Sequence, residues 1–562
     1  MATGVPSPSV SVVVIGHDDA AHVGDAVRSA LAQGPAVREV VAVDDGSTDG
    51  SADLLARLAA GEPRVRVVPR ETNSGGCGTP RNTGITAVTS PYVMFLDSDD
   101  VLPTGAVDAL LGAATRAGAE VVGGLCVRRE LPSGRERPWQ AALYAAPTVL
   151  ARPSDRPRLV HDTLCVNKLY RTAFLREHGI RFPEGRFLYE DFVFTARVLA
   201  AGPRVALVPD PVYVWHVRRS AARLSLSLDR GSVENWRART EACALAHDIL
   251  LGAGQKELAR AARAKFLDHD LRMYARDLGS RDAHHRRAWW ALTQAHLARY
   301  EAPDWEHDPT TPGHLLARVV LESPEPRDLP RLRELAARPA RLLPPYARAP
   351  DGTPVWSADL PGVPLAPLLT RPTGLLSLTV DARLHPRARV MRLRLHELYG
   401  RVARAVPETL ETWWQHREDN RTTQHHTTPF PTEPNTVTGA DAATEAEGAA
   451  EAEGATGTEC IARPDDARWS VEVPFDPEAL GAGTWDLRLR VRFRDGAHRE
   501  TTAHATTDTT RRHALPSAHH GILLLHPCAT HSGALSLRVA PGVRGALSIL
   551  TDRLRRLTTR AG

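Results

Sequence analysis

The sequence predicts an α/β domain first, a helical linker after it, and all-β sandwich domains at the C-terminal end. Over residues 1–228, short apolar runs rich in β-branched residues alternate with amphipathic stretches, which is typical of a mostly parallel sheet covered by helices. Beyond residue 355, apolar residues recur at every second position, as in half-buried antiparallel strands. With 42% hydrophobic and 24% charged residues among 562, the chain can bury a core, and wholesale disorder is excluded.

Strands and helices of the first domain follow one another along the chain. Residues 9–15 are apolar and β-branched, which predicts a buried strand. The next expected strand, at 38–43, ends at the polar run 44–47. A helix is expected to begin at Ser51, whose hydroxyl can cap its first turn. The full set of expected elements is strands at 9–15, 38–43, 65–69 and 92–96, and helices at 25–32, 51–60 and 82–88.

The rest of the chain changes character twice. Residues 232–341 are rich in Ala, Leu and Arg at helical spacing, and proline-rich stretches at 323–330 and 339–354 mark linkers. The Ala/Glu/Gly tract at 442–457 cannot bury apolar area, which predicts disorder around it. The expected domains are residues 1–228, 229–350, 355–500 with a disordered insertion at about 418–464, and a second, partial β module at 516–562.

Composition excludes several classes of protein. No run approaches the roughly 20 apolar residues of a membrane-spanning helix, and the first residues lack the regions of a secretory signal. The net charge is +4 without a dense basic block, so nucleic acid is not an expected partner. The six cysteines are scattered, without the spacing of a zinc site or a disulfide framework. We expect a cytoplasmic protein with at most peripheral contact with the inner face of the cell membrane.

The strongest local signal follows the expected strand at 92–96. Asp97 and Asp99 form an Asp-x-Asp pair where this strand ends, and ligands of such sheets bind beyond the carboxyl ends of the strands. Hard cations such as Mn²⁺ or Mg²⁺ take one or two carboxylates together with substrate phosphates. The pair is therefore a candidate site for a metal–diphosphate group, although acidic clusters of this kind are also common in solvated loops.

Three further segments carry candidate functional residues. Asp45 follows the second strand, where a carboxylate can accept hydrogen bonds from a nucleobase or a ribose, or can form a capping turn. A Gly-rich turn leads to Arg81 and Asn82 at a helix start, where an arginine and the helix dipole favour phosphate; its spacing is not that of a Walker loop. Glu190 and Asp191 open an apolar helix, either as a first turn favoured by the dipole or as a general base.

The order of these segments over residues 8–225 resembles the family-2 glycosyltransferases. An N-terminal Val-rich strand, Asp-Asp-Gly-Ser, a Gly-rich turn with Arg-Asn-x-Gly, Asp-Ser-Asp-Asp and a later Glu-Asp pair occur in that family's order. The resemblance implies the GT-A fold, which is Rossmann-like, and a nucleotide-sugar donor. His17 and Asp18 stand where the family usually has Tyr-Asn.

A closer resemblance is to the wall teichoic acid N-acetylglucosaminyltransferases of Gram-positive bacteria. It rests on residues 71–82, 97–100, 168–171 and 182–184, followed by the Glu-Asp pair. Those enzymes carry a helical linker and C-terminal β domains that form trimers, so the resemblance implies a homotrimer by analogy. It also implies inverting transfer of a sugar, GlcNAc from UDP-GlcNAc, to hydroxyls of an anionic polyol-phosphate polymer.

The resemblance implies roles for individual residues. Asp191 would be the catalytic base, with Glu190 positioning the acceptor or the sugar. Asp97 would meet the ribose or the metal, and Asp99 would ligate Mn²⁺ or Mg²⁺. Arg223 stands where the teichoic acid enzymes have a histidine that approaches the metal diphosphate, and it could neutralise the diphosphate directly. Binding of the nucleotide sugar is implied for His17, Asp18, Asp45, Gly76, Arg81, Asn82, Asp97, Ser98, Arg219, Arg223 and Ser225.

Other functions remain open at this level. The same motifs suit a glycosyltransferase that builds a capsule or an exopolysaccharide. A non-catalytic scaffold that binds glycan is disfavoured because Asp45, Asp99 and Asp191 are all present. A nucleotidyltransferase would need a different Gly-rich signature near the N-terminal end, which residues 10–18 lack.

Overall fold

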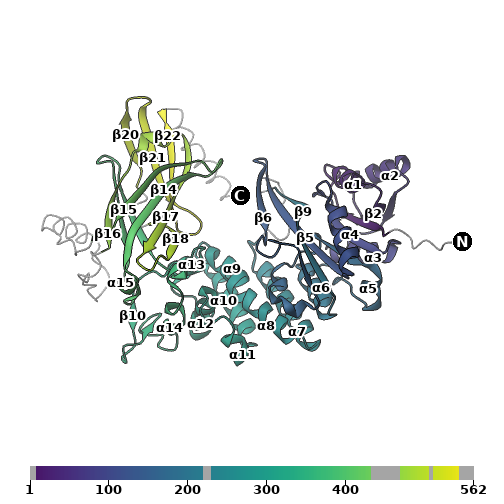
Figure 1. Cartoon of the computed structure of the whole chain (residues 1–562), viewed down its shortest axis with the longest axis horizontal. Helices are drawn as coiled ribbons and strands as arrows, with labels where there is room; N and C mark the ends of the chain where they lie inside the picture. The colour runs from purple at the N-terminus through teal and green to yellow at the C-terminus, as the bar shows by residue number, and fades with distance from the viewer. Residues whose placement is uncertain (1–7, 219–229, 432–468, 506–510, 543–562) are drawn as a thin grey trace. The chain divides into compact units, whose positions relative to one another are not determined.

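A computed structural model describes residues 8–218, 230–431, 469–505 and 511–542 of the chain (Figure 1). The chain divides into two compact units. The first contains residues 1–267 and 288–307, and the second contains residues 268–287 and 308–562. The expected boundary between residues 228 and 229 therefore falls inside the first unit.

The first unit is built on a mixed sheet of nine strands in the order β3-β2-β1-β4-β8-β5-β9-β7, with β6 paired to β5. The four strands from β3 to β4 are parallel, whereas β8 runs antiparallel to both β4 and β5. The strands are β1 (Val10–Gly16), β2 (Val37–Asp44), β3 (Val65–Pro69), β4 (Tyr92–Asp97), β5 (Val121–Leu131), β6 (Arg135–Trp139), β7 (Thr148–Leu150), β8 (Lys168–Arg171) and β9 (Val205–Arg218).

Helices cover this sheet, as the alternating pattern predicts. Val10 to Val14 are almost fully buried, because the central strand β1 is covered on both of its faces. Gly84 allows α3 to approach closely, since a Cβ there would meet Val13. The helices packed on the sheet are α1 (Val23–Leu31), α2 (Ser51–Gly61), α3 (Gly78–Ala87), α4 (Ala106–Ala117), α5 (Thr172–Glu177) and α6 (Glu190–Ala200).

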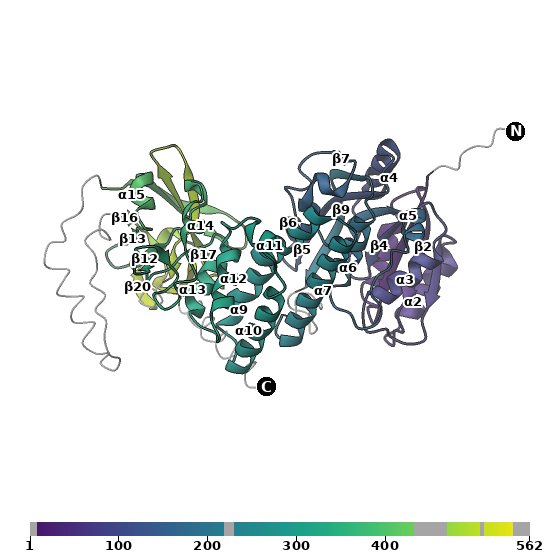
Figure 2. The ribbon, with the colours of Figure 1, turned by 90° about the horizontal axis from the view of Figure 1, so that it is seen from below.

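A helical segment completes the first unit. Its core is aromatic: the ring of Trp236, fully buried, lies 5.7 Å from that of Phe266 and 5.4 Å from that of Trp289. The indole nitrogen of Trp236 donates to Thr293 Oγ1 at 3.1 Å. The helices are α7 (Val233–Gly252), α8 (Lys256–Lys265), α10 (Ala283–Leu297), which belongs to this unit from Ala288 on, and α11 (Ala302–Glu306). Helix α7 packs alongside α6 (Figure 2).

The second unit begins with short helices and continues into two sheets. One sheet has the order β16-β13-β12-β19, and the other has β15-β14-β17-β22-β21-β20 with β18 paired to β17. Burial alternates along β14 and β17, and Trp414 and Trp485 lie on their buried faces. The expected period-two pattern is thus confirmed in these strands.

The elements of the second unit have the following bounds. The helices are α9 (Arg272–Leu278), α12 (Pro312–Glu322), α13 (Leu329–Ala336), α14 (Ala366–Leu369) and α15 (Arg401–Ala405). The strands are β10 (Ala347–Arg348), β11 (Pro354–Val355), β12 (Val380–His385), β13 (Val390–Leu395), β14 (Pro407–His416), β15 (Thr422–Pro429), β16 (Ser470–Pro474), β17 (Gly483–Phe493), β18 (His498–Thr502), β19 (His504–Ala505), β20 (His513–Ser517), β21 (Gly521–Ala529) and β22 (Leu535–Pro541).

Two expectations for this unit need correction. Residues 422–429, expected within the disordered insertion, form β15 and pair with β14, because β-branched threonines suit a strand. The remainder of the expected insertion, from residue 432 on, lies outside the described residues. The separate module expected at 516–562 does not exist within the described residues. Instead β22 pairs with β17, and β20 to β22 extend the same sheet.

Candidate active site

The acidic strand ends meet around one buried arginine. Arg81, in the first turn of α3, is only 3% exposed. Its Nη2 donates to Asp97 Oδ1 at 2.7 Å, and its Nη1 donates to Glu190 Oε1 at 2.6 Å and to Asp191 Oδ1 at 3.0 Å. These four residues form the Arg81 cluster. Strand β4 supplies one carboxylate and the first turn of α6 supplies two, so the fold gathers three negative charges around one positive charge.

The Gly-rich turn before α3 brings the chain segment that precedes α6 up to the cluster. A Cβ on Gly76 would lie 2.6 Å from the carbonyl oxygen of Gly185, and a Cβ on Gly78 would overlap the carbonyl oxygen of Pro183. Any larger residue at either position would push this segment away. The glycines are therefore required for close packing between two parts of the chain.

Asn82 fixes the same segment through its side chain. Its Nδ2 donates to the carbonyl oxygen of Phe182 at 3.0 Å and to Glu184 Oε1 at 2.9 Å, and its Oδ1 accepts from the Phe182 N–H at 2.8 Å. The side-chain amide thus both donates to and accepts from the backbone of Phe182. Binding of the nucleotide sugar by Asn82 stays a prediction, and its observed contacts position the segment that leads into α6.

Electrostatics in the Arg81 cluster raise the pKa values of Glu190 and Asp191. Burial, reinforced by the nearby charge of Asp191, raises the pKa of Glu190 to about 7. Burial likewise raises the pKa of Asp191, against the opposing effects of Arg81 and of the Cys165 N–H, which donates to Asp191 Oδ2 at 3.3 Å. A carboxyl group whose pKa is raised in this way is suited to accept and release protons.

A buried polar network is formed by residues on either side of Cys165 in the sequence. Lys168 Nζ donates to Asp162 Oδ2 at 2.9 Å, Asn167 Nδ2 donates to the same oxygen at 2.9 Å, and the Tyr144 hydroxyl donates to it as well. Burial disfavours the charged form of Asp162, but the Lys168 charge and these hydrogen bonds outweigh it, so the pKa of Asp162 is lowered. This satisfied network holds the backbone that presents the Cys165 N–H to Asp191.

The Asp-x-Asp segment carries three carboxyl groups in different surroundings. Burial, and then repulsion from Asp97, raises the pKa of Asp99 to about 6, although Arg218 Nη1 donates to Asp99 Oδ2 at 3.0 Å. Asp100 is buried, accepts from the Tyr213 hydroxyl at 2.7 Å, and has a pKa raised well above its ordinary value by burial. Asp100 is therefore structural, whereas the other two remain accessible.

The Asp97 and Asp99 side chains fit part of a divalent cation site. They are 33% and 44% exposed, and their mutual repulsion would be relieved by a cation. Among the described residues, no group of three or more His, Cys, Asp or Glu side chains is placed to hold a metal ion. A cation here would need further ligands from phosphate or water, which is how Mg²⁺ usually binds.

Two residues beside this pair, Asp19 and Arg218, were not among the candidates from the sequence. Asp19 Oδ2 accepts a hydrogen bond from Ser98 Oγ at 2.7 Å, which joins the end of β4 to the segment after β1. The position of Asp19 after β1, like that of Asp45 after β2, could have identified it. No sequence pattern indicates Arg218, because its position beside Asp99 depends on how β9 is placed in the sheet.

Asp45 is placed at the end of β2, but its carboxylate is already engaged. Arg70 Nε donates to its Oδ1 at 2.7 Å, and the Ser74 N–H and hydroxyl donate to its Oδ2 at 3.0 and 2.7 Å. The residue is 4% exposed. The Asp45 side chain therefore joins the end of β2 to the Gly-rich turn through these hydrogen bonds.

His17 and Asp18 lie together after β1. His17 Nε2 is 3.3 Å from Asp18 Oδ2, and Asp18 Oδ1 accepts from the Thr48 N–H at 2.7 Å. Asp18 has φ 51°, so the chain turns sharply there. Both residues remain partly exposed beside the end of β2. The candidates Arg219, Arg223 and Ser225 lie outside the described residues.

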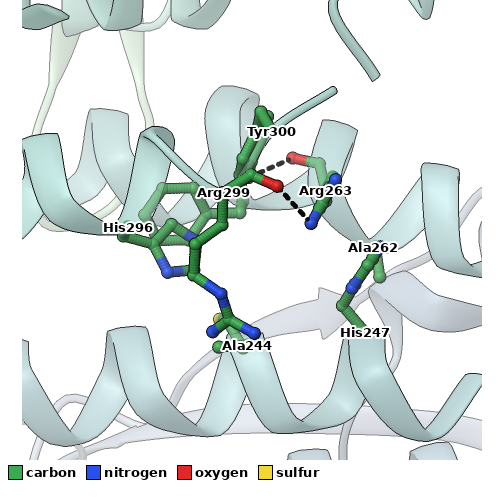
Figure 3. A pocket seen from close by; sticks show the side chains of 9 residues that line it. Ala244, His247, Ala262, Arg263, His296, Arg299 and Tyr300 are labelled. Atoms are coloured by element: carbon green, nitrogen blue, oxygen red, sulfur yellow. Dashed lines mark hydrogen bonds between the residues drawn. The ribbon is translucent and has the colours of Figure 1, made fainter. Parts of the chain in front are cut away.

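A separate pocket, with an empty volume of about 260 Å³, lies between α7, α8 and α10 (Figure 3). Its two arginines have partners: Arg299 Nη2 donates to Asp248 Oδ2 at 2.7 Å, and Arg263 is paired with Asp304 and donates to the Arg299 carbonyl oxygen at 2.7 Å. The pocket thus lacks the excess charge found in the Arg81 cluster, and we assign the candidate active site to the cluster.

The ordered motifs, the sheet topology and this cluster agree with a comparison against known families. Residues 11–179 match the profile of glycosyl transferase family 2. We call these matched residues the family-2 domain. The family-2 domain contains β1 to β8 and therefore includes Arg81 and Asp97, whereas Glu190 and Asp191 follow it.

Individual relatives match over part of the chain. The succinoglycan biosynthesis protein ExoO of Rhizobium meliloti is 31% identical over 227 residues, which is 40% of this chain and 64% of that protein. The poly(ribitol-phosphate) β-N-acetylglucosaminyltransferase TarS of Staphylococcus aureus is 32% identical over 187 residues, which is 33% of this chain and 31% of that protein. The chain thus covers less than two thirds of the length of either relative.

The fold outside the family-2 domain also has a counterpart. The crystal structure of S. aureus TarS matches with a TM-score of 0.50 at 17% identity, covering 95% of this chain and 85% of that one. This likeness supports the predicted order of an α/β GT-A domain, helices and C-terminal β sheets. Within the described residues, no helix combines the length and the apolar character needed to cross a membrane.

Proposed function

We propose that the protein is an inverting glycosyltransferase that uses a nucleotide sugar and that Asp191 is its catalytic base. The observation that carries the proposal is the Arg81 cluster. It joins an acidic pair with raised pKa values to the Asp-x-Asp pair of a family-2 domain. A base for the acceptor and carboxylates for a metal diphosphate are thus linked through one arginine.

The reaction follows from these groups. Asp191 takes the proton from an acceptor hydroxyl as that oxygen attacks the anomeric carbon of the donor. The bond between the anomeric carbon and the diphosphate oxygen breaks, and the nucleoside diphosphate leaves with the electron pair. One displacement inverts the configuration. When bound at Asp97 and Asp99, Mn²⁺ or Mg²⁺ would offset the negative charge that develops on the leaving diphosphate.

The proposed donor is UDP-GlcNAc, and the proposed acceptor is a polyol-phosphate polymer of the teichoic acid type. The names of two relatives support this substrate class. One is TarS, and the other is the poly(ribitol-phosphate) β-glucosyltransferase of Bacillus spizizenii, 30% identical over 189 residues. By analogy with the teichoic acid enzymes, we propose a homotrimer, which light scattering of the full chain would test.

An exopolysaccharide acceptor is the second candidate. It is supported by ExoO and by the succinoglycan biosynthesis protein ExoU of the same bacterium, which is 30% identical over 223 residues. The chain covers 64% of each of these proteins, about twice its coverage of TarS. The two candidates share the donor chemistry and the base and differ in the acceptor.

The test is nucleoside diphosphate release by the purified chain with Mn²⁺, a panel of nucleotide sugars, and either a polyol-phosphate polymer or an exopolysaccharide. The matched variants are Asp191→Asn and Asp108→Asn, the latter on an exposed helix position. We expect release that depends on one polymer and is lost only in Asp191→Asn. Equal background release in all three proteins would contradict the proposed activity, and dependence on the exopolysaccharide would favour the second candidate.

A further inference from the structure

The residue directly before the acidic pair has an unusual backbone conformation. Tyr189 is the N-cap of α6 and has φ 64° and ψ 34°, in the left-handed region. A bulky residue is rare there, because its Cβ crowds the neighbouring backbone. Such a conformation persists only where the surroundings hold it, and it often marks a functional site. The question is therefore what holds Tyr189.

Two buried residues of α7 contact the Tyr189 side chain. The hydroxyl donates to Asn235 Oδ1 at 2.8 Å, and the guanidinium of Arg239 lies 4.6 Å from the centre of the ring. Asn235 and Arg239 are 4% and 7% exposed. The N–H of Asn235 in turn donates to Ser232 Oγ, which caps α7. Tyr189 is thus fixed at both its ring and its hydroxyl.

The next turn of α6 is held from the same side. Arg239 also lies 4.9 Å from the ring centre of Phe192, and Lys265 Nζ of α8 lies 4.1 Å from it. A cation over an aromatic face is attractive, and more so away from water. Residues on both sides of Glu190 and Asp191 are therefore anchored to α7 and α8.

We infer that Tyr189, Asn235 and Arg239 form a latch through which α7 positions Asp191 against Arg81 and the Cys165 N–H. The inference rests on the proposed function, because it gives these three positioning residues a role in the same transfer reaction. The helical segment expected to be a linker thus becomes part of the support of the active site. The left-handed conformation of Tyr189 sets the direction in which α6 begins, and the latch holds Tyr189 in that conformation.

The latch has a consequence for the charge of Asp191. Both Arg81 and the Cys165 N–H favour its ionised form. If the turn relaxes while Asp191 stays buried, these contacts lengthen and the carboxyl holds its proton up to a higher pH. Weakening the latch should therefore lower kcat and move the acid limb of the pH–rate profile to higher pH, while donor KM changes little. A contribution to stability alone would not move the acid limb.

The kinetic test uses Tyr189→Phe, Asn235→Leu and the double variant in the full chain. Tyr189→Phe removes one oxygen and keeps the ring. Because one hydrogen bond is removed, we expect kcat to fall about three- to tenfold in each single variant, with no further fall in the double variant. Arg239→Met should behave like them, and Arg237→Met, on the exposed face of α7, should match the wild type. Independent, multiplicative effects, or an unmoved acid limb, would overturn the latch.

A second measurement does not depend on turnover. Hydrogen exchange of the full chain should be about tenfold faster in Tyr189→Phe for amides of residues 165 and 190–193, with the β1 and β4 amides unchanged. Unchanged exchange at 190–193 overturns the proposal, and so does faster exchange without any change in kcat or in the pH profile. If the wild type transfers no sugar from any donor, the proposed function fails, while the exchange rates still decide whether the latch positions the turn.

Discussion

Each compact unit contains a buried arginine paired with a carboxylate, and the two sites are built differently. In the first unit, Arg81 meets three carboxylates, two of which have raised pKa values. In the second unit, Glu334 is fully buried and meets two arginines: Arg341 Nε donates to its Oε2 at 2.7 Å, and Arg333 Nη2 donates to its Oε1 at 2.9 Å. One site has an excess of negative charge and the other does not.

The difference distinguishes a site that stabilises the fold from a site suited to proton transfer. At the second site, Arg341 also donates to Thr502 and to the backbone carbonyl of Ser532, so its donors are used within the unit. Breaking such a pair mainly costs stability. The Arg81 cluster instead leaves carboxylates poorly neutralised, an arrangement that costs stability but shifts pKa values towards the range useful for proton transfer. Variants at the two sites should therefore fail in different ways.

The largest effect is expected for Arg81→Met. Without the guanidinium, three carboxylates repel one another and Asp191 is neither oriented nor kept ionised. We expect polymer-dependent transfer to fall about a thousandfold, within the range of a lost general base. Steady-state kinetics of the folded fraction, beside Arg57→Met on an exposed face of α2, would measure it. A fall of less than tenfold would mean that the cluster is a structural site like that of Glu334.

The second effect is on stability. Arg341→Met leaves Glu334 buried with one arginine, which should lower the free energy of unfolding by about 3 kcal/mol, as for other broken buried pairs. Denaturant unfolding would measure the loss, and transfer per folded molecule should stay within about twofold of the wild type. Arg338→Met, at a side chain 54% exposed, is the matched control. Equal unfolding curves for the two variants would remove the contrast between the sites.

The third effect is on the pH dependence of transfer. Glu190 has a pKa of about 7, so it loses its proton near neutrality. Repulsion between Glu190 and Asp191 disfavours the ionised form of either group while the other is charged. Because ionised Glu190 is proposed to position the acceptor or the sugar, the wild-type rate should fall as the pH drops below about 7. In Glu190→Gln this group no longer titrates, so the acid limb near pH 7 should be absent from the residual rate. A limb that stays near pH 7 would show that it does not belong to Glu190.

The smallest effect is on the stability of the metal-free protein. The folded-state pKa of Asp99 is raised from 3.8 to about 6, so its protonated form favours folding. This contribution is complete below about pH 4 and is lost as the pH rises through 6. Asp99→Asn should therefore be more stable than the wild type above pH 6, by about 1 kcal/mol after allowing for screening at a side chain 44% exposed.

Calorimetry in EDTA at pH 4 and pH 7.5 would test this, with Asp108→Asn as the exposed control. The variant and the wild type should differ only at the higher pH. A variant that is less stable at pH 7.5 would mean that the ion pair with Arg218 outweighs the repulsion from Asp97. Mn²⁺ should raise the melting temperature of the wild type more than that of the variant, if the proposed cation site is correct.

The outcome of the sequence predictions depends on the range of the interactions involved. The parallel strands β1 to β4 and the Asp-x-Asp pair follow from local patterns, because apolar runs ending in acidic residues place carboxylates at one edge of a sheet. The nucleotide-binding roles expected for Asn82 and Asp45 stay predictions. What no local pattern indicates is that both side chains also hold other parts of the chain, through partners at residues 182 and 70.

The sequence by itself determined the fold class and the match of residues 11–179 to glycosyl transferase family 2, because periodicity and motif order are properties of neighbouring residues. Tertiary structure decided which charges share a neighbour. Only folding brings Glu190 and Asp191 to Arg81, sets Tyr189 against Asn235, and joins β22 to β17. Burial and the distance between charges set the pKa of a carboxyl group, and neither can be obtained from the order of residues alone.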